Sequence, residues 1–159
     1  MIKCKLIVLG SLKEKYLAEA CREYEKRLSR YCSLETYVIE PVRLPEKPSN
    51  REIEAALQKE AELILKKIPE NSRIIALCVE GEPYSSEGFA QLIKSDAAAG
   101  KTLVFIIGSS YGLSECVKNA ADKGLSLSKM TFPHQLFRVM LLEQIYRAFK
   151  INEGSAYHK

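Results

Sequence analysis

The sequence predicts an α/β fold, with a mostly parallel sheet that carries helices on both faces. Short apolar runs alternate with longer stretches of helical periodicity, in the approximate order βαβαβαβαβα. The later runs, RIIALCVEG (73–81) and KTLVFIIG (101–108), are apolar almost throughout, as is typical of parallel strands that helices cover on both sides. The 159 residues, 47% of them hydrophobic, suffice for one core, so we expect a single domain over residues 1–159.

The first half of the chain predicts two strands and two helices. IKCKLIVLG (2–10) and SLETYVIE (33–40) predict the strands, and the stretch 12–31 between them predicts a helix. The apolar stripe of that helix is Leu17, Cys21, Tyr24 and Leu28. Three prolines in 41–50 exclude regular structure there. A surface helix then follows over 51–68, capped by Ser49 or Asn50. Its expected buried face is Ile53, Leu57, Ala61, Ile64 and Ile68.

The second half predicts strands at 73–81, 101–108 and 124–128, with helices at 86–98 and near 113–123 between them. A last helix, from Pro133 to about Lys150, is apolar around nearly its whole circumference. Its only polar stripe is Glu143, Arg147 and Lys150. Such a helix must be covered on most sides. We expect a second subunit to supply part of this cover, the alternative being deep burial within one chain.

Composition excludes several classes of protein. The five cysteines are scattered without a CxxC pair, which argues against disulfides and against a metal site and favours a reducing compartment. The apolar run near the N-terminus is too short to span a bilayer, so we expect a cytoplasmic protein without a membrane segment. The net charge of +4 allows an anionic partner such as RNA, although no stretch resembles an RNA-binding tail.

Three strand ends carry loop signals, and ligands of open α/β sheets bind at the carboxyl ends of strands. These are Glu80 with Gly81, GSSYG (108–112) and LSLSKMTFPH (125–134). GSSYG lacks a phosphate-binding fingerprint and is also explained as a strand-to-helix turn. His134, at the positive end of the last helix, is either a ligand contact or a structural histidine. Arg138, one turn later, must meet a carboxylate or reach a phosphate.

The chain has no paired carboxylates, no nucleophile beside an obvious base and no metal-spaced ligands. Hydrolysis and covalent catalysis are therefore poorly supported. Transfer of a group from a bound cofactor fits better, because the cofactor then carries the reactive atom and the protein orients and shields it.

The segment LSLSKMTFPHQLFRVMLLEQIYRAFKI and the ending GSAYHK closely resemble the RlmH family, small methyltransferases of the SPOUT superfamily. LGSLKEKY, YEKRL and SSEGFA extend the likeness along the whole chain. The resemblance implies a SPOUT (α/β-knot) fold with a C-terminal trefoil knot and a homodimer. It also implies an S-adenosylmethionine-dependent enzyme that methylates ring nitrogen three of a pseudouridine in large-subunit (23S) ribosomal RNA, on assembled ribosomes.

The resemblance also assigns site residues. The cofactor contacts that it implies are Leu77, Gly108, Leu127, Ser128, Lys129, Met130, Thr131 and Phe132. Ser109 stands where the family often has a second glycine, which leaves the path of that loop open. His158 is the candidate base by residue type, Tyr157 or Lys159 would stack on or anchor the nucleotide, and Arg138 would contact phosphate.

Two other functions remain open to test. A non-enzymatic RNA-binding or ribosome-assembly factor with the same fold would bind RNA without cofactor. A nucleotide-binding reductase would need a phosphate loop and an acidic ribose ligand, and the sequence contains neither.

Overall fold

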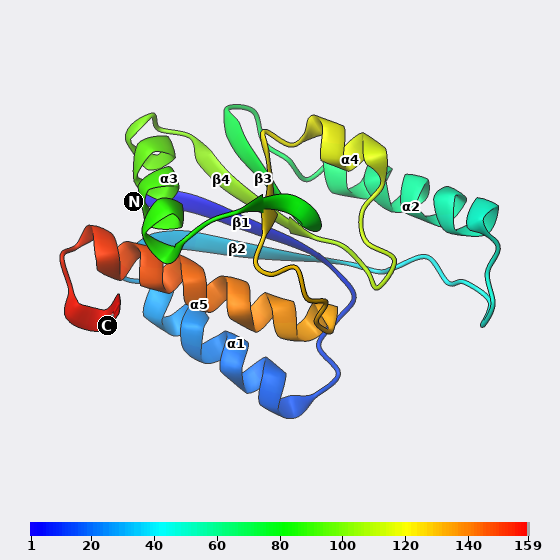
Figure 1. Cartoon of the computed structure of the whole chain (residues 1–159), viewed down its shortest axis with the longest axis horizontal. Helices are drawn as coiled ribbons and strands as arrows, with labels where there is room; N and C mark the ends of the chain where they lie inside the picture. Colours follow the sequence, from blue (N-terminus) through cyan, green and yellow to red (C-terminus); the bar gives the residue numbers. More distant parts are fainter. Residues whose placement is uncertain (159) are drawn as a thin grey trace.

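The computed structural model describes residues 1–158, of which the side chain of His158 is not described. Its centre is a five-stranded sheet in the order β2-β1-β4-β3-β5, and every pair of neighbouring strands is parallel. Figure 1 shows this sheet between two layers of helices. The strands are β1 (Ile2–Leu9), β2 (Cys32–Ile39), β3 (Ser72–Pro83), β4 (Thr102–Ile107) and β5 (Lys123–Ser126). The predicted α/β class and the parallel sheet are confirmed.

Helices cover both faces of the sheet, as predicted. The helices are α1 (Lys15–Leu28), α2 (Asn50–Leu65), α3 (Ser86–Ala98), α4 (Glu115–Ala120) and α5 (His134–Asn152), with a short 3-10 turn η1 (Ala156–His158) at the end. One apolar cluster joins α1, α3 and α5 to the sheet around Phe105, and the second joins α2 and α4 to it around Ile106. The two clusters share no buried residue, because successive side chains of a strand point to opposite faces.

The structure corrects the predicted buried face of α2. Ile53 and Leu57 are only half-buried, whereas Ala56 and Glu60 are buried beside Ala61 and Ile64. Glu60 faces inward because its carboxylate accepts a hydrogen bond from the backbone N–H of Val42 at 3.0 Å. That bond fastens the proline-rich loop to α2. Periodicity alone could not find it, because the partner is a backbone group of a distant segment.

Two further sequence interpretations change. Pro133 lies before the first turn of α5 as its N-cap, because its ψ of 132° is extended, and the helix begins at His134. Cys4, Cys21 and Cys32 are buried, whereas Cys78 is half-buried and Cys116 is exposed. Burial of cysteine therefore holds in β1, β2 and α1 and fails in β3 and α4.

Backbone segments approach each other closely where β3 meets β5. A register shift separates the pairs at Leu77 and Glu82, and a Cβ on Gly81 would lie 2.7 Å from the carbonyl carbon of Gly124. Only glycine permits such an approach. This contact holds the end of β3 against β5, beside the loop that leads into α5.

Helix α5 is only partly covered by its own chain. Leu141, Leu142 and Ile145 are fully buried, while the side chains of the first two turns are half-exposed, Phe137 and Val139 among them. Within residues 1–158, no helix combines the length and the apolar character needed to cross a membrane. The same part of the chain contains no cluster of three or more His, Cys, Asp and Glu side chains placed to hold a metal ion.

Candidate active site

A cavity of about 420 Å³ lies where β3 and β4 end and α5 begins. Its walls come from all three strand-end segments that the sequence indicated. Its lining includes Leu77, Glu80, Gly108, Thr131, Phe132 and His134. A volume in this range suits a ligand the size of a nucleoside derivative. Four of the predicted cofactor residues, Leu77, Gly108, Thr131 and Phe132, therefore share one cavity.

The loop after β4 is shaped by glycines at both ends. A Cβ on Gly108 would lie 2.3 Å from the carbonyl oxygen of Gly112, so only glycine fits there. Gly112 has a φ of +82° and donates its N–H to the carbonyl of Ser109 at 2.8 Å. The Ser109 hydroxyl accepts a hydrogen bond from the backbone N–H of Tyr111 at 3.3 Å. Ser109 thus closes the turn from within, at the position where the sequence left the loop path open.

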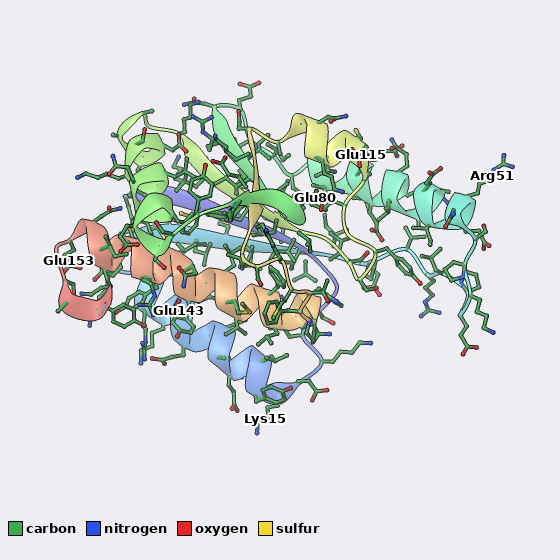
Figure 2. All side chains as sticks on the ribbon, in the orientation of Figure 1. Lys15, Arg51, Glu80, Glu115, Glu143 and Glu153 are labelled. Carbon is green, nitrogen blue, oxygen red and sulfur yellow. The ribbon has the colours of Figure 1, made fainter. Side chains whose placement is uncertain are left out.

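One ion pair lies on the wall of the cavity. The ammonium group of Lys118, on α4, contacts the carboxylate of Glu80 at the end of β3. The hydrogen bond from Lys118 lowers the pKa of Glu80, and the same bond raises the pKa of Lys118. Figure 2 shows Glu80 beside the α4 residue Glu115, well apart from Glu143 on α5. The pair brings a fixed carboxylate to a cavity whose other walls are mainly apolar.

His134 begins α5 and also lines the cavity. Partial burial holds its pKa below its ordinary value of 6.5, and the nearby charge of Lys13 adds to this effect. The side chain of the next residue, Gln135, accepts a hydrogen bond from the backbone N–H of Lys13 at 3.0 Å. This contact ties the segment before α1 to the start of α5. A neutral imidazole therefore faces the cavity at neutral pH.

The segment 127–132 is divided between different surroundings. Thr131 and Phe132 line the cavity, and Phe132 packs edge-on against Phe137 with 5.7 Å between the ring centroids. Leu127 instead lines a second cavity of about 370 Å³, which it shares with Glu143 and Tyr24.

The middle of this segment folds on itself. The Ser128 hydroxyl accepts a hydrogen bond from the backbone N–H of Met130 at 3.0 Å, and the Ser128 carbonyl accepts one from Ser126 Oγ at 2.9 Å. The side chains of Lys129 and Met130 are exposed. The segment therefore forms a wall between the two cavities, held by its own serines.

The C-terminal tail turns back onto α5. Gly154, with a φ of +81°, allows the turn. Tyr157 packs edge-on against Tyr146 at 5.1 Å between ring centroids, and the Arg147 guanidinium lies 4.9 Å from the Tyr157 ring centroid. The side chain of His158 and all of Lys159 lie outside the described residues. Of the three predicted tail groups, the structure thus places the phenol alone.

Comparison with known proteins identifies the family. The sequence model of a family described as a predicted SPOUT methyltransferase matches residues 2–158. A protein of Clostridium acetobutylicum named ribosomal RNA large subunit methyltransferase H is 48% identical over 155 residues, which cover 97% of this chain and 98% of the relative. A Streptococcus suis protein of the same name is 46% identical over 159 residues, with 99% and 100% covered. The chain belongs to the SPOUT methyltransferase family.

The family assignment confirms the resemblance read from the C-terminal motif. A crystal structure of a methylase family protein from Neisseria gonorrhoeae has a TM-score of 0.52 to this chain, with 10% identity, and the match covers 91% of this chain and 82% of the other. At that identity the likeness concerns the fold alone. The SPOUT methyltransferase fold is therefore supported by both sequence and structure.

Arg138 of this SPOUT methyltransferase carries a buried polar atom without a partner among residues 1–158. It is half-buried, yet its Nε has no hydrogen-bond partner within residues 1–158. Its charge acts on Cys21 of α1, which places it on the side of α5 that faces α1. The sequence required a carboxylate or a phosphate for Arg138. No carboxylate among the described residues pairs with Arg138. A contact between Arg138 and phosphate therefore remains a proposal.

Sequence reasoning missed several residues that line the cavity of this SPOUT methyltransferase. The sequence pattern predicts Lys118 only as part of a short helix and Phe137 only as part of an apolar helix, yet both line the cavity. Tyr111 lies within GSSYG, where no pattern gives it a role, although it lines the cavity and remains 46% exposed. No spacing signal could join Lys118 to Glu80, because they lie on different elements and meet only when β3 and α4 pack together.

Proposed function

We propose that this protein uses S-adenosylmethionine to methylate ring nitrogen three of a pseudouridine in large-subunit ribosomal RNA. The observation that carries the proposal is the meeting of three strand-end loops around one cavity, in a chain whose relatives are named ribosomal RNA large subunit methyltransferase H. The proposal includes the homodimer and the C-terminal trefoil knot that the resemblance implies. Close passage of Gly81 past Gly124 supports a tight crossing of backbone segments there.

The residues around the cavity fit S-adenosylmethionine. Leu77, Phe132 and Phe137 provide apolar surface for an adenine ring, and the loop at Gly108 brings backbone groups close to it. The Glu80 carboxylate, held by its ion pair with Lys118, lies on a wall that a cationic cofactor would face. When bound, the cofactor supplies an electrophilic methyl group on its sulfonium. Thr131 and Phe132, the part of the segment 127–132 that lines this cavity, would hold that group in place.

The chain's own residues must position the nucleotide and take up a proton. In a neutral pseudouridine, ring nitrogen three carries a proton, so transfer of a methyl group to that atom requires its removal. His158 is the candidate for this base, because an imidazole titrates near neutral pH. Tyr157 and Lys159 would hold the base or the phosphate of the nucleotide, and Arg138 would contact phosphate. Positioning of this kind contributes on the order of 7 to 11 kcal/mol in well-oriented reactions.

The tail acts across the dimer in this proposal. Tyr157 packs against Tyr146 and Arg147, whereas the cofactor cavity lies at His134. The helix rise of 1.5 Å per residue separates His134 from Arg147 by about 20 Å. Figure 1 shows the C-terminus at the far end of α5 from the loops that enclose the cavity. A tail that serves a cofactor site therefore serves that of a second copy.

A substrate on assembled ribosomes explains how so small a chain recognises RNA. The net charge of +4 is modest, and the whole chain is one domain in this proposal. Two copies and the shape of the ribosomal particle would supply the remaining recognition, in the cytoplasm where ribosomes work. Exposed cations, Lys129 among them, would add phosphate contacts that weaken with salt.

The deciding experiment is transfer of a labelled methyl group from S-adenosylmethionine to ribosomal RNA. Naked RNA, isolated large subunits and assembled ribosomes from cells that lack the enzyme are compared, and mass mapping locates the modified nucleotide. We expect one methylated pseudouridine and the best transfer on assembled particles. Absence of transfer to all three substrates would refute the proposal.

The alternative is a non-enzymatic RNA-binding or assembly factor with the same fold. The cavity at Gly108 and Phe132 favours the enzyme, because such a factor needs no cofactor site. Calorimetry with S-adenosylmethionine separates the two functions. The enzyme binds the cofactor in the cavity, and the factor binds RNA alone.

A further inference from the structure

A second charged surface lies away from the cofactor cavity, where α1 ends beside the last turns of α5. It is a shallow pocket of about 250 Å³, which we name the α1/α5 basic pocket. Its cations and rings are Lys26, Arg27, Arg30, Lys150, Tyr31 and Tyr146. Figure 2 marks this end of α5 by its label for Glu153. None of these six residues belongs to the predicted cofactor or catalytic groups.

The charges of the α1/α5 basic pocket do not cancel. Arg27 donates to Glu23 at 2.8 Å, and Lys150 donates to Glu153 at 3.2 Å. For Lys26 and Arg30, no carboxylate of residues 1–158 lies within 4.0 Å. Both side chains are exposed. Two cations are therefore left over at one pocket, free to bind an anion from outside the chain.

Stabilisation of the helix explains only part of this cluster. Lys26 and Arg27 lie in the last turn of α1, where positive charge favours the helix dipole. Arg30 lies beyond the end of α1, and Lys150 comes from another helix. A role in capping α1 thus accounts for neither of them. The convergence of cations from two elements instead indicates a binding surface.

Aromatic rings lie among these cations in fixed positions. The Arg27 guanidinium lies 5.7 Å from the ring centroid of Tyr146. Tyr31 stacks on Phe149 with 5.5 Å between centroids and an interplanar angle of 10°, and its hydroxyl donates to Glu153 at 2.8 Å. Cations beside held aromatic rings are the chemistry that binds single-stranded nucleic acid, since phosphates meet the charges and bases meet the rings.

We propose that the α1/α5 basic pocket binds a single-stranded segment of the ribosomal RNA substrate, with Lys26 and Arg30 on its phosphates. The inference rests on the proposed function and adds the surface by which the substrate is held. The pocket is continuous with the tail, because Tyr146 lines it and also contacts Tyr157. RNA bound there leads directly to the residues proposed to receive the target nucleotide.

The test uses the full-length protein with Lys26→Ala and Arg30→Ala combined, and Lys59→Ala and Lys66→Ala combined as the matched control. Lys59 and Lys66 are exposed and belong to α2 and its C-cap, against the other face of the sheet. Binding to a large-subunit RNA fragment is measured at several salt concentrations, together with cofactor affinity by calorimetry, thermal stability and molecular mass in solution. Arg30→Ala alone serves as the milder second variant.

Loss of two phosphate contacts predicts about tenfold weaker RNA binding near physiological salt, and a log–log salt slope smaller in magnitude by about 1.4 for a single strand. The control should keep the wild-type slope, and cofactor affinity should be unchanged in all variants. RNA affinity equal to that of the control would overturn the inference. So would a change in molecular mass, because the pocket would then join two copies of the chain. Failure of the wild type to methylate any RNA would instead refute the proposed function.

Discussion

The guanidinium of Arg147 donates two hydrogen bonds to Glu143 Oε1, from Nη2 at 2.6 Å and from Nε at 3.0 Å. The sequence suggested a helix-stabilising pair, and the structure adds a third member. Arg147 Nη1 reaches the carbonyl of Tyr157 at 3.4 Å, and the Tyr157 hydroxyl donates to Glu143 Oε1 at the same distance. The pair therefore holds the start of the C-terminal tail as well as the helix.

Arg147→Met should separate these two roles. A helical pair of this spacing contributes about 0.5 kcal/mol to helix stability, so the unfolding free energy should change little. Methyl transfer should fall by at least about tenfold, because a loss of only 1.4 kcal/mol of transition-state positioning suffices. Single-turnover rates and calorimetric cofactor binding measure the two effects. Normal turnover would mean that the tail needs no anchor on α5.

Removal of residues 157–159 should abolish methyl transfer and leave cofactor binding and dimer mass largely intact. The cavity proposed for the cofactor is built from the strand-end loops and the start of α5, and its lining among the described residues includes no part of the tail. His158→Ala and His158→Gln then test the base within the intact tail. A near-normal single-turnover rate in both variants would eliminate His158 as the base.

Gly108→Ala should weaken cofactor binding by about tenfold or more, equivalent to 1.4 kcal/mol. The added Cβ would meet the carbonyl oxygen of Gly112 at 2.3 Å and force the cavity loop to move. Gly100→Ala is the matched control, because that glycine has a φ of +68° and nothing within 4 Å of the added Cβ. The control should lose about 1 kcal/mol of stability through its backbone conformation and keep its cofactor affinity. Calorimetry measures the cofactor affinity of the two variants, and thermal unfolding measures their stability.

The lowered pKa of His134 predicts a stability that depends on pH. Because burial disfavours protonation in the folded state, the unfolded state binds more protons below pH 6.5. The contribution of His134 is therefore complete above pH 6.5 and decreases as the pH falls below it, until the folded form is protonated as well. His134→Gln should reduce this loss of stability at low pH. The slope of stability against pH should differ least between the two proteins near pH 8. Thermal unfolding of both proteins from pH 5 to 8 measures this difference. Parallel stability profiles of the two proteins would contradict the role given to His134.

Arg73→Leu should destabilise the fold by about 3 kcal/mol, because it leaves a buried carboxylate without its cation. Arg73 Nη2 lies 2.9 Å from Asp96 Oδ1, and the side chain of Asp96 is only 4% exposed. Arg27→Leu removes an exposed pair and should change stability little. Denaturant unfolding measures both variants. Cofactor affinity should stay normal in the folded fraction of each, since neither residue lines the cavity.

The order of elements was predictable because strands and helices differ in their local hydrophobic period. All five strands and all five α-helices lie where the sequence predicts them, within a few residues at each end. The face of α2 was not predictable in the same way. Glu60 is buried because its carboxylate accepts a hydrogen bond from the backbone N–H of Val42. Helical periodicity carries no information about a partner eighteen positions away.

The sequence by itself determined the class of fold, the family and the three loops in which a cofactor site could lie, because these follow from local patterns and a long motif. Only the tertiary structure decided that Leu77, Gly108, Thr131 and Phe132 share one cavity while Leu127 faces another. It also decided that Tyr157 lies against Arg147, far from the cavity of its own chain. The physical reason is that parallel strands bring their carboxyl ends together at one edge of the sheet, whereas a long straight helix separates its two ends.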